Sequence, residues 1–427
     1  MQTQAGRQAG EPYRRFLARL QDVRRHGVEL GLDRVRLALE RLGSPQLRVP
    51  AVHIAGTNGK GSCAAMTDSI LRAAGLRTGL FTSPHLTRFT ERIRIDGQDI
   101  DGDYLAALDA RVAATAVPLT YFEVATVLAF LAFAEAKVDV AVLETGLGGR
   151  LDATSVCHPV ACAITSIAFD HEALLGNTLS AIAYEKACIA KPGVPIFLAP
   201  LPPEADARVA EVAKQVGALV RRSGIDFPAA PVPPALPGPH QLANAALAMA
   251  LSQQAAFALG HSLDDVTVRR GLVEVRWPGR LERIADDVLL DCAHNVEGAT
   301  ALATALPEAP RRVLVTSIVR DKNAAGMLAV LAPAFDSVVL TRSHGERASE
   351  PEQLARLIAR TRGGAPQVAC IEPVADALVW ARSSAREVAG GLVVVAGSIF
   401  LVGEARALVL GHGTGTAMPA EASDPLP

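Results

Sequence analysis

Short apolar runs alternate with segments of helical periodicity along almost the whole chain. Apolar residues recur every three to four positions between residues 16 and 42, with a break at Gly27, so this segment is expected to form two helices joined by a turn. Continuous apolar runs at residues 49–52, 138–143 and 159–166 predict short strands buried on both faces. Because strand and helix signals alternate, we expect an α/β protein with parallel-rich sheets.

The alternation pauses at a proline-rich stretch, residues 227–239, which is expected to be a stiff surface connector. From Val288 onward, strand and helix signals alternate again, which predicts a second parallel sheet with helices on both faces. We therefore expect an N-terminal domain over residues 1–281 and a smaller, Rossmann-like α/β domain over residues 286–411. Residues 412–427, rich in Gly, Ala and Pro, are expected to be a disordered tail.

Residues 53–62, His-Ile-Ala-Gly-Thr-Asn-Gly-Lys-Gly-Ser, form a glycine-rich loop between a predicted strand and a predicted helix. Backbone N–H groups, the positive end of the helix and the ammonium of Lys60 would converge on an anion such as a nucleotide phosphate. The string departs from the common P-loop, because Ile54 replaces its first glycine and Gly61 separates Lys60 from Ser62. By itself, the loop leaves phosphate binding and a simple tight turn both open.

Polar side chains stand where three predicted strands end. Ser83, Glu144 and His171 each lie at or just past the carboxyl end of a strand, the edge where open parallel sheets bind ligands. Hydroxyl, carboxylate and imidazole groups together can hold a divalent metal ion. For each residue alone, an ordinary polar residue that closes a strand is the favoured interpretation. Their coincidence with a phosphate loop favours the metal site.

Composition narrows the function. The chain has 427 residues and a formal net charge of −2, so it is long enough for two domains and has no basic excess that would indicate nucleic-acid binding. Its six cysteines form no Cys-x-x-Cys pair and are expected to be free thiols in a reducing cytoplasm. No apolar run reaches membrane-spanning length and residues 1–12 lack a signal core. We expect a cytoplasmic protein, off the membrane and monomeric.

A series of motifs follows in order from residue 13 to residue 410. They are His53 to Ser62, Ser83-Pro-His-Leu with Glu91-Arg92, Glu144 to Asp152, Asp170-His171 with Leu175-Gly176, Glu185-Lys186-Ala187, Gly238 with His240-Gln241 and Asn244, Pro278-Gly-Arg280, and Asp291 to Asn295. This ordered set resembles the folate branch of the Mur ligase superfamily, the folylpolyglutamate and dihydrofolate synthases. One such string is a common chance match, whereas the ordered set is far more specific.

The resemblance implies a ligase with an N-terminal ATPase domain and a C-terminal glutamate-ligase domain. ATP phosphorylates a folate or pteroate carboxylate, and the amine of L-glutamate then displaces the phosphate. Lys60 would neutralise charge as the phosphoryl group moves. The ATP-binding residues that the resemblance implies are Gly56, Thr57, Asn58, Gly59, Lys60, Gly61, Ser62, Asn244, Arg280, Asp291 and His294.

The resemblance also implies two Mg²⁺ ions and a modified lysine. Ser62 and Ser83 with Glu144 would hold one ion, and Glu144 with His171 the other. Lys186 matches a lysine that the family carbamylates, and a salt bridge of the unmodified amine is the alternative. The implied catalytic residues are Lys60, Lys186 and His171. The implied pterin or folate contacts are Val28, Glu29, Leu30, Phe122, Glu123 and Asp152.

The leading hypothesis is therefore an enzyme that adds L-glutamate both to 7,8-dihydropteroate and to reduced folates. The nearest alternative extends folates only, and the implied pterin contacts favour the bifunctional form. A cell-wall Mur ligase is less favoured, because that branch adds an N-terminal nucleotide-sugar domain and this chain reaches its phosphate loop by residue 56. A non-catalytic ATP-binding protein would not need Lys60, Glu144 and His171 together.

Overall fold

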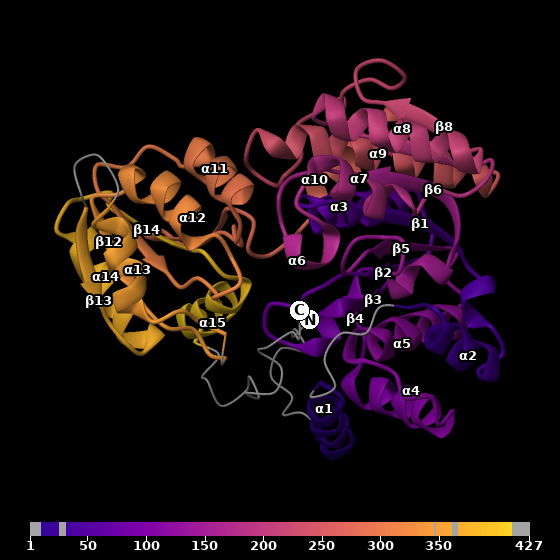
Figure 1. Cartoon of the computed structure of the whole chain (residues 1–427), viewed down its shortest axis with the longest axis horizontal. Coiled ribbons are helices and arrows are strands. Elements are labelled where there is room, and N and C mark those ends of the chain that lie inside the picture. The colour runs from indigo at the N-terminus through magenta and orange to yellow at the C-terminus, as the bar shows by residue number, and fades with distance from the viewer. Residues whose placement is uncertain (1–9, 25–30, 346, 361–365, 412–427) are drawn as a thin grey trace.

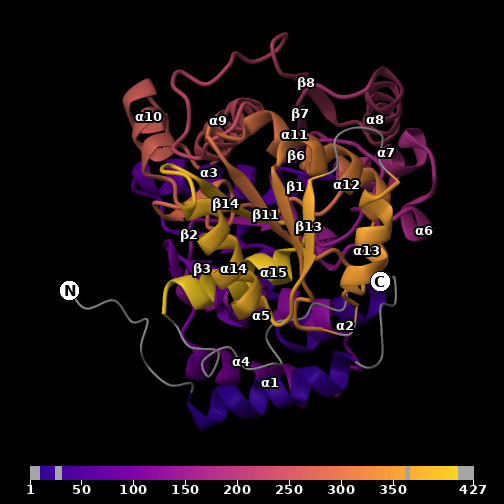
Figure 2. The same ribbon diagram turned by 90° about the vertical axis from the view of Figure 1, so that its left-hand side faces the viewer.

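The computed structural model describes residues 10–24, 31–345, 347–360 and 366–411. These residues form two α/β bodies that lie side by side, each built around its own sheet (Figure 1). Figure 2 looks onto the C-terminal body, with the N-terminal body behind it. Within the described ranges, none of the helices has the length and apolar character needed to span a bilayer.

The sheet of the N-terminal body has eight strands in the order β4-β3-β2-β5-β1-β6-β7-β8. From β2 to β8 the neighbouring strands are parallel, and β3 and β4 add the predicted antiparallel hairpin at one edge. The strands are β1 (Pro50–Ala55), β2 (Thr78–Phe81), β3 (Ile93–Ile95), β4 (Gln98–Asp99), β5 (Val140–Glu144), β6 (His158–Ile164), β7 (Pro195–Leu198) and β8 (Leu219–Arg222).

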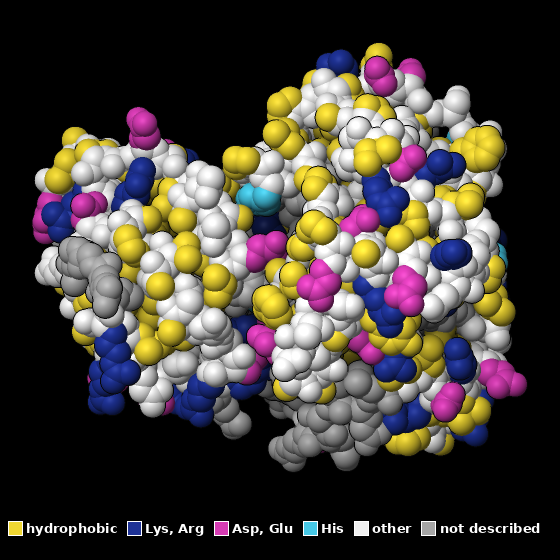
Figure 3. Space-filling model, turned by 45° about the horizontal axis from the view of Figure 1, so that its top comes forward, with side chains coloured by type: hydrophobic (Ala, Val, Ile, Leu, Met, Phe, Trp, Pro, Cys, Tyr) yellow, Lys and Arg dark blue, Asp and Glu magenta, His cyan; other side chains and the backbone are white. Residues whose placement is uncertain are grey.

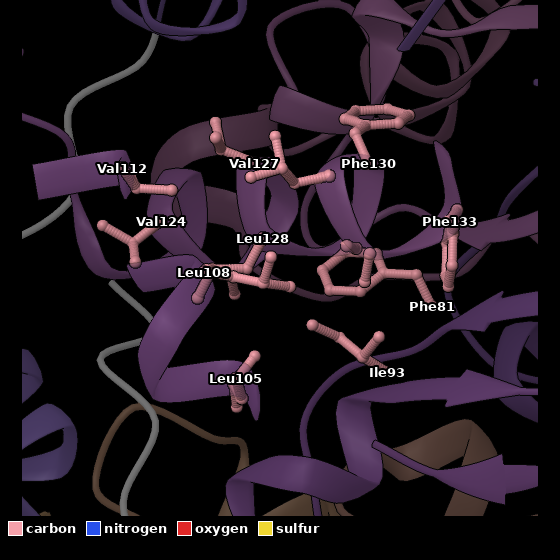
Figure 4. Close-up of a cluster of buried hydrophobic side chains, with 14 of the residues drawn as sticks. Phe81, Ile93, Leu105, Leu108, Val112, Val124, Val127, Leu128, Phe130 and Phe133 are labelled. Carbon is pink, nitrogen blue, oxygen red and sulfur yellow. The ribbon is translucent and has the colours of Figure 1, made fainter. Parts of the chain in front are cut away.

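Helices cover both faces of this sheet. On one face, α5 packs against the sheet and is covered by α1, α2 and α4. Figure 4 shows Phe81 of the sheet beside Phe133 of α5, with Ile93 close to Phe81. On the other face, α3 packs against α9 and α10. The helices are α1 (Glu11–Arg24), α2 (Asp33–Arg41), α3 (Lys60–Ala73), α4 (Gly102–Ala114), α5 (Tyr121–Ala136), α6 (Glu172–Leu175), α7 (Leu179–Ala187), α8 (Pro203–Val216), α9 (His240–Ala258) and α10 (Asp265–Glu274), with short 3-10 turns η1 (Pro45–Leu47), η2 (Phe89–Arg92) and η3 (Ala153–Val156).

The sheet of the C-terminal body has six strands in the order β13-β12-β11-β14-β10-β9. All neighbours are parallel except β9, which runs antiparallel to β10. The elements are β9 (Glu282–Ala285), β10 (Val288–Leu290), α11 (Val296–Ala305), β11 (Arg312–Thr316), α12 (Ala324–Leu331), η4 (Ala332–Ala334), β12 (Ser337–Leu340), α13 (Pro351–Ile358), β13 (Gln367–Cys370), α14 (Val374–Arg386), β14 (Leu392–Ala396) and α15 (Ile399–Val409).

The predicted α/β class with parallel-rich sheets is confirmed, and the elements that were not predicted include α4 and β9. Helix α4 begins at Asp101, whose side chain accepts hydrogen bonds from the first turn, and it buries Leu105, Leu108 and Val112. Strand β9 lies between the two predicted domain ranges and pairs with β10. Residues 412–427, the predicted tail, lie outside the described residues. The domain boundaries themselves stay predictions.

The two bodies meet at a hollow in the molecular surface, with a histidine and acidic side chains beside it (Figure 3). The phosphate loop opens at this junction, because Asn58 of the loop contacts Asn295 at the start of α11. The carboxyl ends of β1, β5 and β6 therefore face the beginning of the C-terminal body. Asn58, His171 and His294, three of the predicted site residues, lie at this junction.

Candidate active site

The loop between β1 and α3 requires glycine at two positions. Gly56 has φ 154° and Gly59 has φ 85°, in the region that side chains rarely adopt. A Cβ atom at Gly56 would lie 1.9 Å from Thr165 Oγ1, and one at Gly59 would lie 2.6 Å from Asn244 Oδ1. The loop backbone is thus in close contact with the end of β6 and with α9.

Hydrogen bonds from the segment after β6 fix the loop. The Thr57 amide donates to the carbonyl of Ser166 (2.9 Å), and the Asn58 amide donates to Ser166 Oγ (3.0 Å). Thr165 Oγ1 in turn donates to the Asn58 carbonyl (2.6 Å). These hydrogen bonds hold the loop backbone in one shape, as anion binding at a helix start requires.

Lys60 begins α3 and lies beside Glu144 at the end of β5. Lys60 Nζ donates to the carbonyl of Thr57 (3.1 Å) and is 4.0 Å from Glu144 Oε1. The Ser83 amide donates to Glu144 Oε2 (3.2 Å). Burial raises the pKa of the Glu144 carboxyl, and the Lys60 ammonium partly opposes that rise. The structure thus brings together Lys60, Ser83 and Glu144.

Ser62 lies in the first turn of α3, beside the same carboxylate. Gln241 Nε2 donates to Ser62 Oγ (3.3 Å), and a Cβ atom on the preceding Gly61 would lie 3.4 Å from Glu144 Oε2. Among the residues that the structure describes, no group of three or more His, Cys, Asp or Glu could hold a metal ion. Mg²⁺ usually takes one or two carboxylates and completes its shell with water and phosphate oxygens. One buried carboxylate with nearby hydroxyls fits that kind of ion.

His171 directly precedes α6 in the N-terminal body and contacts Lys322 of the C-terminal body. Its Nε2 atom is 3.3 Å from Lys322 Nζ and 3.9 Å from Asp170 Oδ1. Burial, and then the charge of Lys322, lower the pKa of His171 to about 4. The imidazole is therefore neutral at physiological pH and keeps a lone pair for a metal ion. His171 faces Asp170 and Lys322, whereas Glu144 faces Lys60 and Ser83.

Lys186 on α7 is buried, with 5% of its surface exposed, and its Nζ atom donates to the carbonyl of Gly56 (2.9 Å). Burial, and then the charge of Lys60, lower the pKa of Lys186 to about 7. A large fraction of this amine is therefore neutral near pH 7. The neighbouring Glu185 pairs with Arg150 at 3.0 Å. In the structure, Lys186 thus contacts the phosphate loop through a carbonyl group.

The predicted ATP contacts near the junction form two groups: Asn244 lies on α9, and Arg280 and Asp291 lie where the chain enters the C-terminal body. Asn244 Nδ2 donates to Gln241 Oε1 (2.9 Å), which holds its amide against the loop. Asp291, directly after β10, accepts hydrogen bonds from the amides of Leu281 (3.0 Å) and Ala293 (2.9 Å) and so ties the residue before β9 to the end of β10. Arg280 is next to Leu281, and the charges of Asp291 and Glu144 both favour its cationic form.

His294 lies close to the junction, and its Nδ1 atom is 2.9 Å from the carbonyl oxygen of Cys292. Burial, and then the charge of Lys322, lower the pKa of His294 to about 4. Its Nε2 atom is 3.9 Å from Asp170 Oδ2. His294 and His171 therefore approach the same aspartate from the two bodies.

Sequence reasoning missed two residues at the junction. Lys322, in the loop after β11, places Nζ 2.5 Å from Asp170 Oδ1. Glu297, in the first turn of α11, accepts a hydrogen bond from Asn58 Nδ2 (2.5 Å). Neither residue has a local signal, because an acid in a first helical turn and a lysine in a surface loop are both ordinary. Only the placement of one body against the other reveals them.

The predicted pterin contacts are only partly described. Val28, Glu29 and Leu30 lie outside the described residues. Glu123 accepts from the Thr120 amide (2.7 Å) and from Arg34 Nη2 (3.1 Å).

Asp152 and Phe122 both support the second glycine loop, residues 145–149. The Asp152 carboxylate accepts from the amides of Thr154 (3.0 Å) and Leu147 (2.9 Å), and a Cβ atom at Gly146 would lie 2.5 Å from Phe122 Cζ. Both predicted acids, Glu123 and Asp152, thus hold their own segments in place. Their contact with a pterin stays a prediction.

Comparison with known proteins adds to this geometry. Residues 279–399 match the family model described as Mur ligase, glutamate ligase domain. The chain is 38% identical over 441 residues to the dihydrofolate synthase/folylpolyglutamate synthase of Mycobacterium tuberculosis, covering 89% of this chain and 90% of that protein. It is 36% identical to a probable bifunctional folylpolyglutamate synthase/dihydropteroate synthase of Haloferax volcanii, of whose length it spans 49%.

A solved structure agrees with the fold over nearly the whole chain. It is the bifunctional folylpolyglutamate synthase/dihydrofolate synthase with Mn, AMPPNP and L-glutamate bound. The TM-score is 0.82 at 33% sequence identity, and the match covers 95% of this chain and 99% of the other. The likeness thus extends across both bodies and their junction.

Proposed function

This chain belongs to the family of dihydrofolate and folylpolyglutamate synthases, which are ATP-dependent ligases of the Mur type, and we propose that it adds L-glutamate both to 7,8-dihydropteroate and to reduced folates. Membership follows from 38% identity over nearly the full length of a relative with that name. The family prediction made from the sequence is thereby confirmed. The two acceptors are the part that we propose.

One observation carries the proposal: a preorganised phosphate loop opens directly onto the start of the second body. Lys60 and Glu144 lie 4.0 Å apart on the N-terminal side, and Asn58 of the loop exchanges hydrogen bonds with Asn295 on the other. A ligase of this type must hold ATP, a carboxylate and an amine within reach of one another. A junction between two bodies offers contacts for ATP, the carboxylate and the amine from both sides.

In the proposed reaction, the γ-phosphoryl group of ATP moves to the acceptor carboxylate, which yields ADP and an acyl phosphate. The glutamate nitrogen then attacks the acyl carbon, forms the amide bond, loses a proton and releases phosphate. Lys60 would offset the negative charge that moves with the phosphoryl group. The loop from Gly56 to Ser62 would hold the triphosphate, with Asn244, Arg280, Asp291 and His294 completing the nucleotide contacts.

We propose that the divalent ion is Mg²⁺, with one site at Ser62, Ser83 and Glu144 and a second at Glu144 and His171. Such an ion would polarise the phosphate oxygens and stabilise the charge of the transferred group. The buried carboxylate and the neutral imidazole supply the donors.

Lys186 is proposed to be carbamylated, since a buried amine with a pKa near 7 is in part the neutral nucleophile that reacts with carbon dioxide. Labelling with ¹³C-bicarbonate tests this. A carbamate carbon resonance is expected in the wild-type protein, and Lys186→Met should remove it. An identical spectrum from both proteins would contradict the modification.

We further propose a cytoplasmic monomer acting on small molecules. Free thiols at all six cysteines suit a reducing compartment. A net charge of −2 gives no general attraction for nucleic acid or for anionic lipid.

Phosphate release with ATP, Mg²⁺ and L-glutamate tests the proposed function. The acceptors compared are 7,8-dihydropteroate and a reduced folate, and omission of L-glutamate is the control. Release with both acceptors is expected. Release with the folate alone would restrict the function to polyglutamylation, and no release with either would overturn the proposal.

A further inference from the structure

The ion pair between Asp170 and Lys322 joins the two bodies beside the candidate site. Asp170 follows β6 in the N-terminal body, and Lys322 follows β11 in the C-terminal body. Lys322 Nζ lies 2.5 Å from Asp170 Oδ1, and the side chains are only 7% and 9% exposed. Burial alone would raise the pKa of the Asp170 carboxyl, but the Lys322 ammonium holds it well below its usual range.

Three further polar groups surround this pair. Asn295 Nδ2 donates to Asp170 Oδ2 (3.1 Å), and His294 Nε2 lies 3.9 Å from the same oxygen. On the N-terminal side, His171 Nε2 is 3.3 Å from Lys322 Nζ. Asp170 is therefore close to three side chains of the C-terminal body, those of Lys322, Asn295 and His294. Lys322 also contacts His171, the residue after Asp170.

Stability alone is a weak reason for such a pair. Taking two charges out of water costs several kcal/mol per ion, and an apolar pair of similar size is often as stable or more so. What an ion pair adds is a defined geometry between its partners. Here the geometry is that of two loops, each following a parallel strand and each next to predicted substrate or metal contacts.

We propose that Asp170 and Lys322 act as one positioning unit that fixes the C-terminal body against the phosphate loop during ligation. The unit rests on the proposed function, because its purpose is to hold the amine-binding body at the right distance from the acyl phosphate. Lys322 is a positioning residue in this scheme. It sets the distance between the loop that carries His171 and the loop that follows β11.

A double-mutant cycle on turnover tests the unit, with the variants Lys322→Met, Asp170→Asn and the two combined. Lys322→Met is expected to lower kcat by about 10- to 100-fold, the loss that a misplacement near 1 Å can cause, while the KM for ATP stays within about threefold. The combined variant should lose no more than the worse single variant, because both break the same unit. Lys322→Arg, which keeps the charge, should recover part of kcat.

The matched control is Arg382→Met, which removes a bidentate ion pair to Asp287 inside the C-terminal body. Arg382→Met should leave kcat within about twofold of wild type. It should lower the melting temperature by as much as Lys322→Met does, or by more. If Lys322→Met does not fold at the assay temperature, Lys322→Gln replaces it in the cycle. A kcat within twofold of wild type in a folded Lys322 variant, or single losses that multiply in the combined variant, would overturn the inference.

A second measurement separates this inference from the proposed function. Small-angle X-ray scattering without substrates should give a larger radius of gyration for Lys322→Met than for wild type and Arg382→Met. A larger radius together with an inactive wild-type protein would remove the proposed function and keep the contact between the bodies. If the wild type is active and Lys322→Met has the same kcat and the same radius of gyration as wild type, the positioning unit is refuted and the proposed function stands.

Discussion

Two glycines at the ends of α3 allow the phosphate loop to be tested with a matched pair of substitutions. Gly59 precedes the helix with φ 85°, and Gly75 follows it with φ 84°. A Cβ atom at Gly59 would lie 2.6 Å from Asn244 Oδ1, whereas one at Gly75 would meet no atom within 4 Å. Gly59→Ala and Gly75→Ala therefore share the backbone strain and differ in the contact with Asn244.

The shared strain has a predictable size. Placing alanine in the left-handed region costs about 1–2 kcal/mol, and the smaller entropy of the unfolded alanine chain offsets about 0.4–1 kcal/mol of this. Each variant should thus lose about 1 kcal/mol of unfolding free energy. For a domain of this size, that is roughly 2–4 °C in melting temperature. Both variants should show it.

Only Gly59→Ala should disturb nucleotide binding. Asn244 Oδ1 must retreat from 2.6 Å to at least 3.0 Å, and Asn244 is buried and bound to Gln241 at 2.9 Å. Since a misplacement of 1 Å can cost about 100-fold, a shift near half that size is expected to raise the KM for ATP about tenfold. Gly75→Ala should change the KM by less than about twofold.

Steady-state phosphate release over a range of ATP concentrations measures the difference, and differential scanning fluorimetry measures the shared strain. Adding Asn244→Ala to Gly59→Ala checks the cause, because the double variant should be no worse than Asn244→Ala alone. Equal KM values for Gly59→Ala and Gly75→Ala, at equal melting temperatures, would refute the role of Asn244 at the loop.

Three further predictions follow from the same geometry. Lys60→Met should lower kcat by at least about 100- to 1000-fold in phosphate release, and a near-normal kcat would contradict charge compensation by this lysine. Glu144→Gln should raise the Mg²⁺ concentration needed for half-maximal activity by at least about tenfold, and an unchanged Mg²⁺ dependence would exclude it as a ligand. Burial lowers the pKa of His53 to about 3, so the unfolded state binds a proton that the folded state rejects, and stability is complete above pH 6.5 and lost as the pH falls toward 3. His53→Gln should therefore flatten the urea-derived free energy of unfolding, by about 1 kcal/mol per pH unit between pH 6 and 4, and parallel curves would contradict this.

The fold could be predicted where the burial of an element also determines its pattern of apolar residues. Parallel strands are buried on both faces, so residues 138–143 read as a continuous apolar run and contain most of β5. The second parallel sheet was predicted from the alternation that begins again at Val288. Strand β9 was not, because a four-residue edge strand depends on pairing with β10 rather than on its own pattern. Helix α4 was missed although Asp101 and the spacing of its buried leucines gave a signal.

The candidate site divides in the same way. The phosphate loop is local, since strand, glycines and helix follow one another within residues 50–73 and could be predicted together. The contact between Asp170 and Lys322 joins residues that are 152 positions apart. No spacing rule reaches that far, because the angle between two bodies depends on the whole interface. The carboxylates of Glu123 and Asp152 accept hydrogen bonds from their own segments, and a pterin contact of either acid stays a prediction.

Asn295 connects the C-terminal body to the proposed nucleotide site. Its Oδ1 atom accepts from the Gly298 amide (2.8 Å), the ordinary cap of α11, and also from Asn58 Nδ2 (3.1 Å). Its Nδ2 atom donates to Asn58 Oδ1 (3.0 Å) and to Asp170 Oδ2 (3.1 Å). The side-chain amide of Asn295 thus caps α11 of the C-terminal body and also binds Asn58 in the phosphate loop of the N-terminal body. A displacement of α11 must then either move Asn58 or break both hydrogen bonds between Asn58 and Asn295. The position of the C-terminal body is therefore coupled to the shape of the loop that we propose to bind ATP.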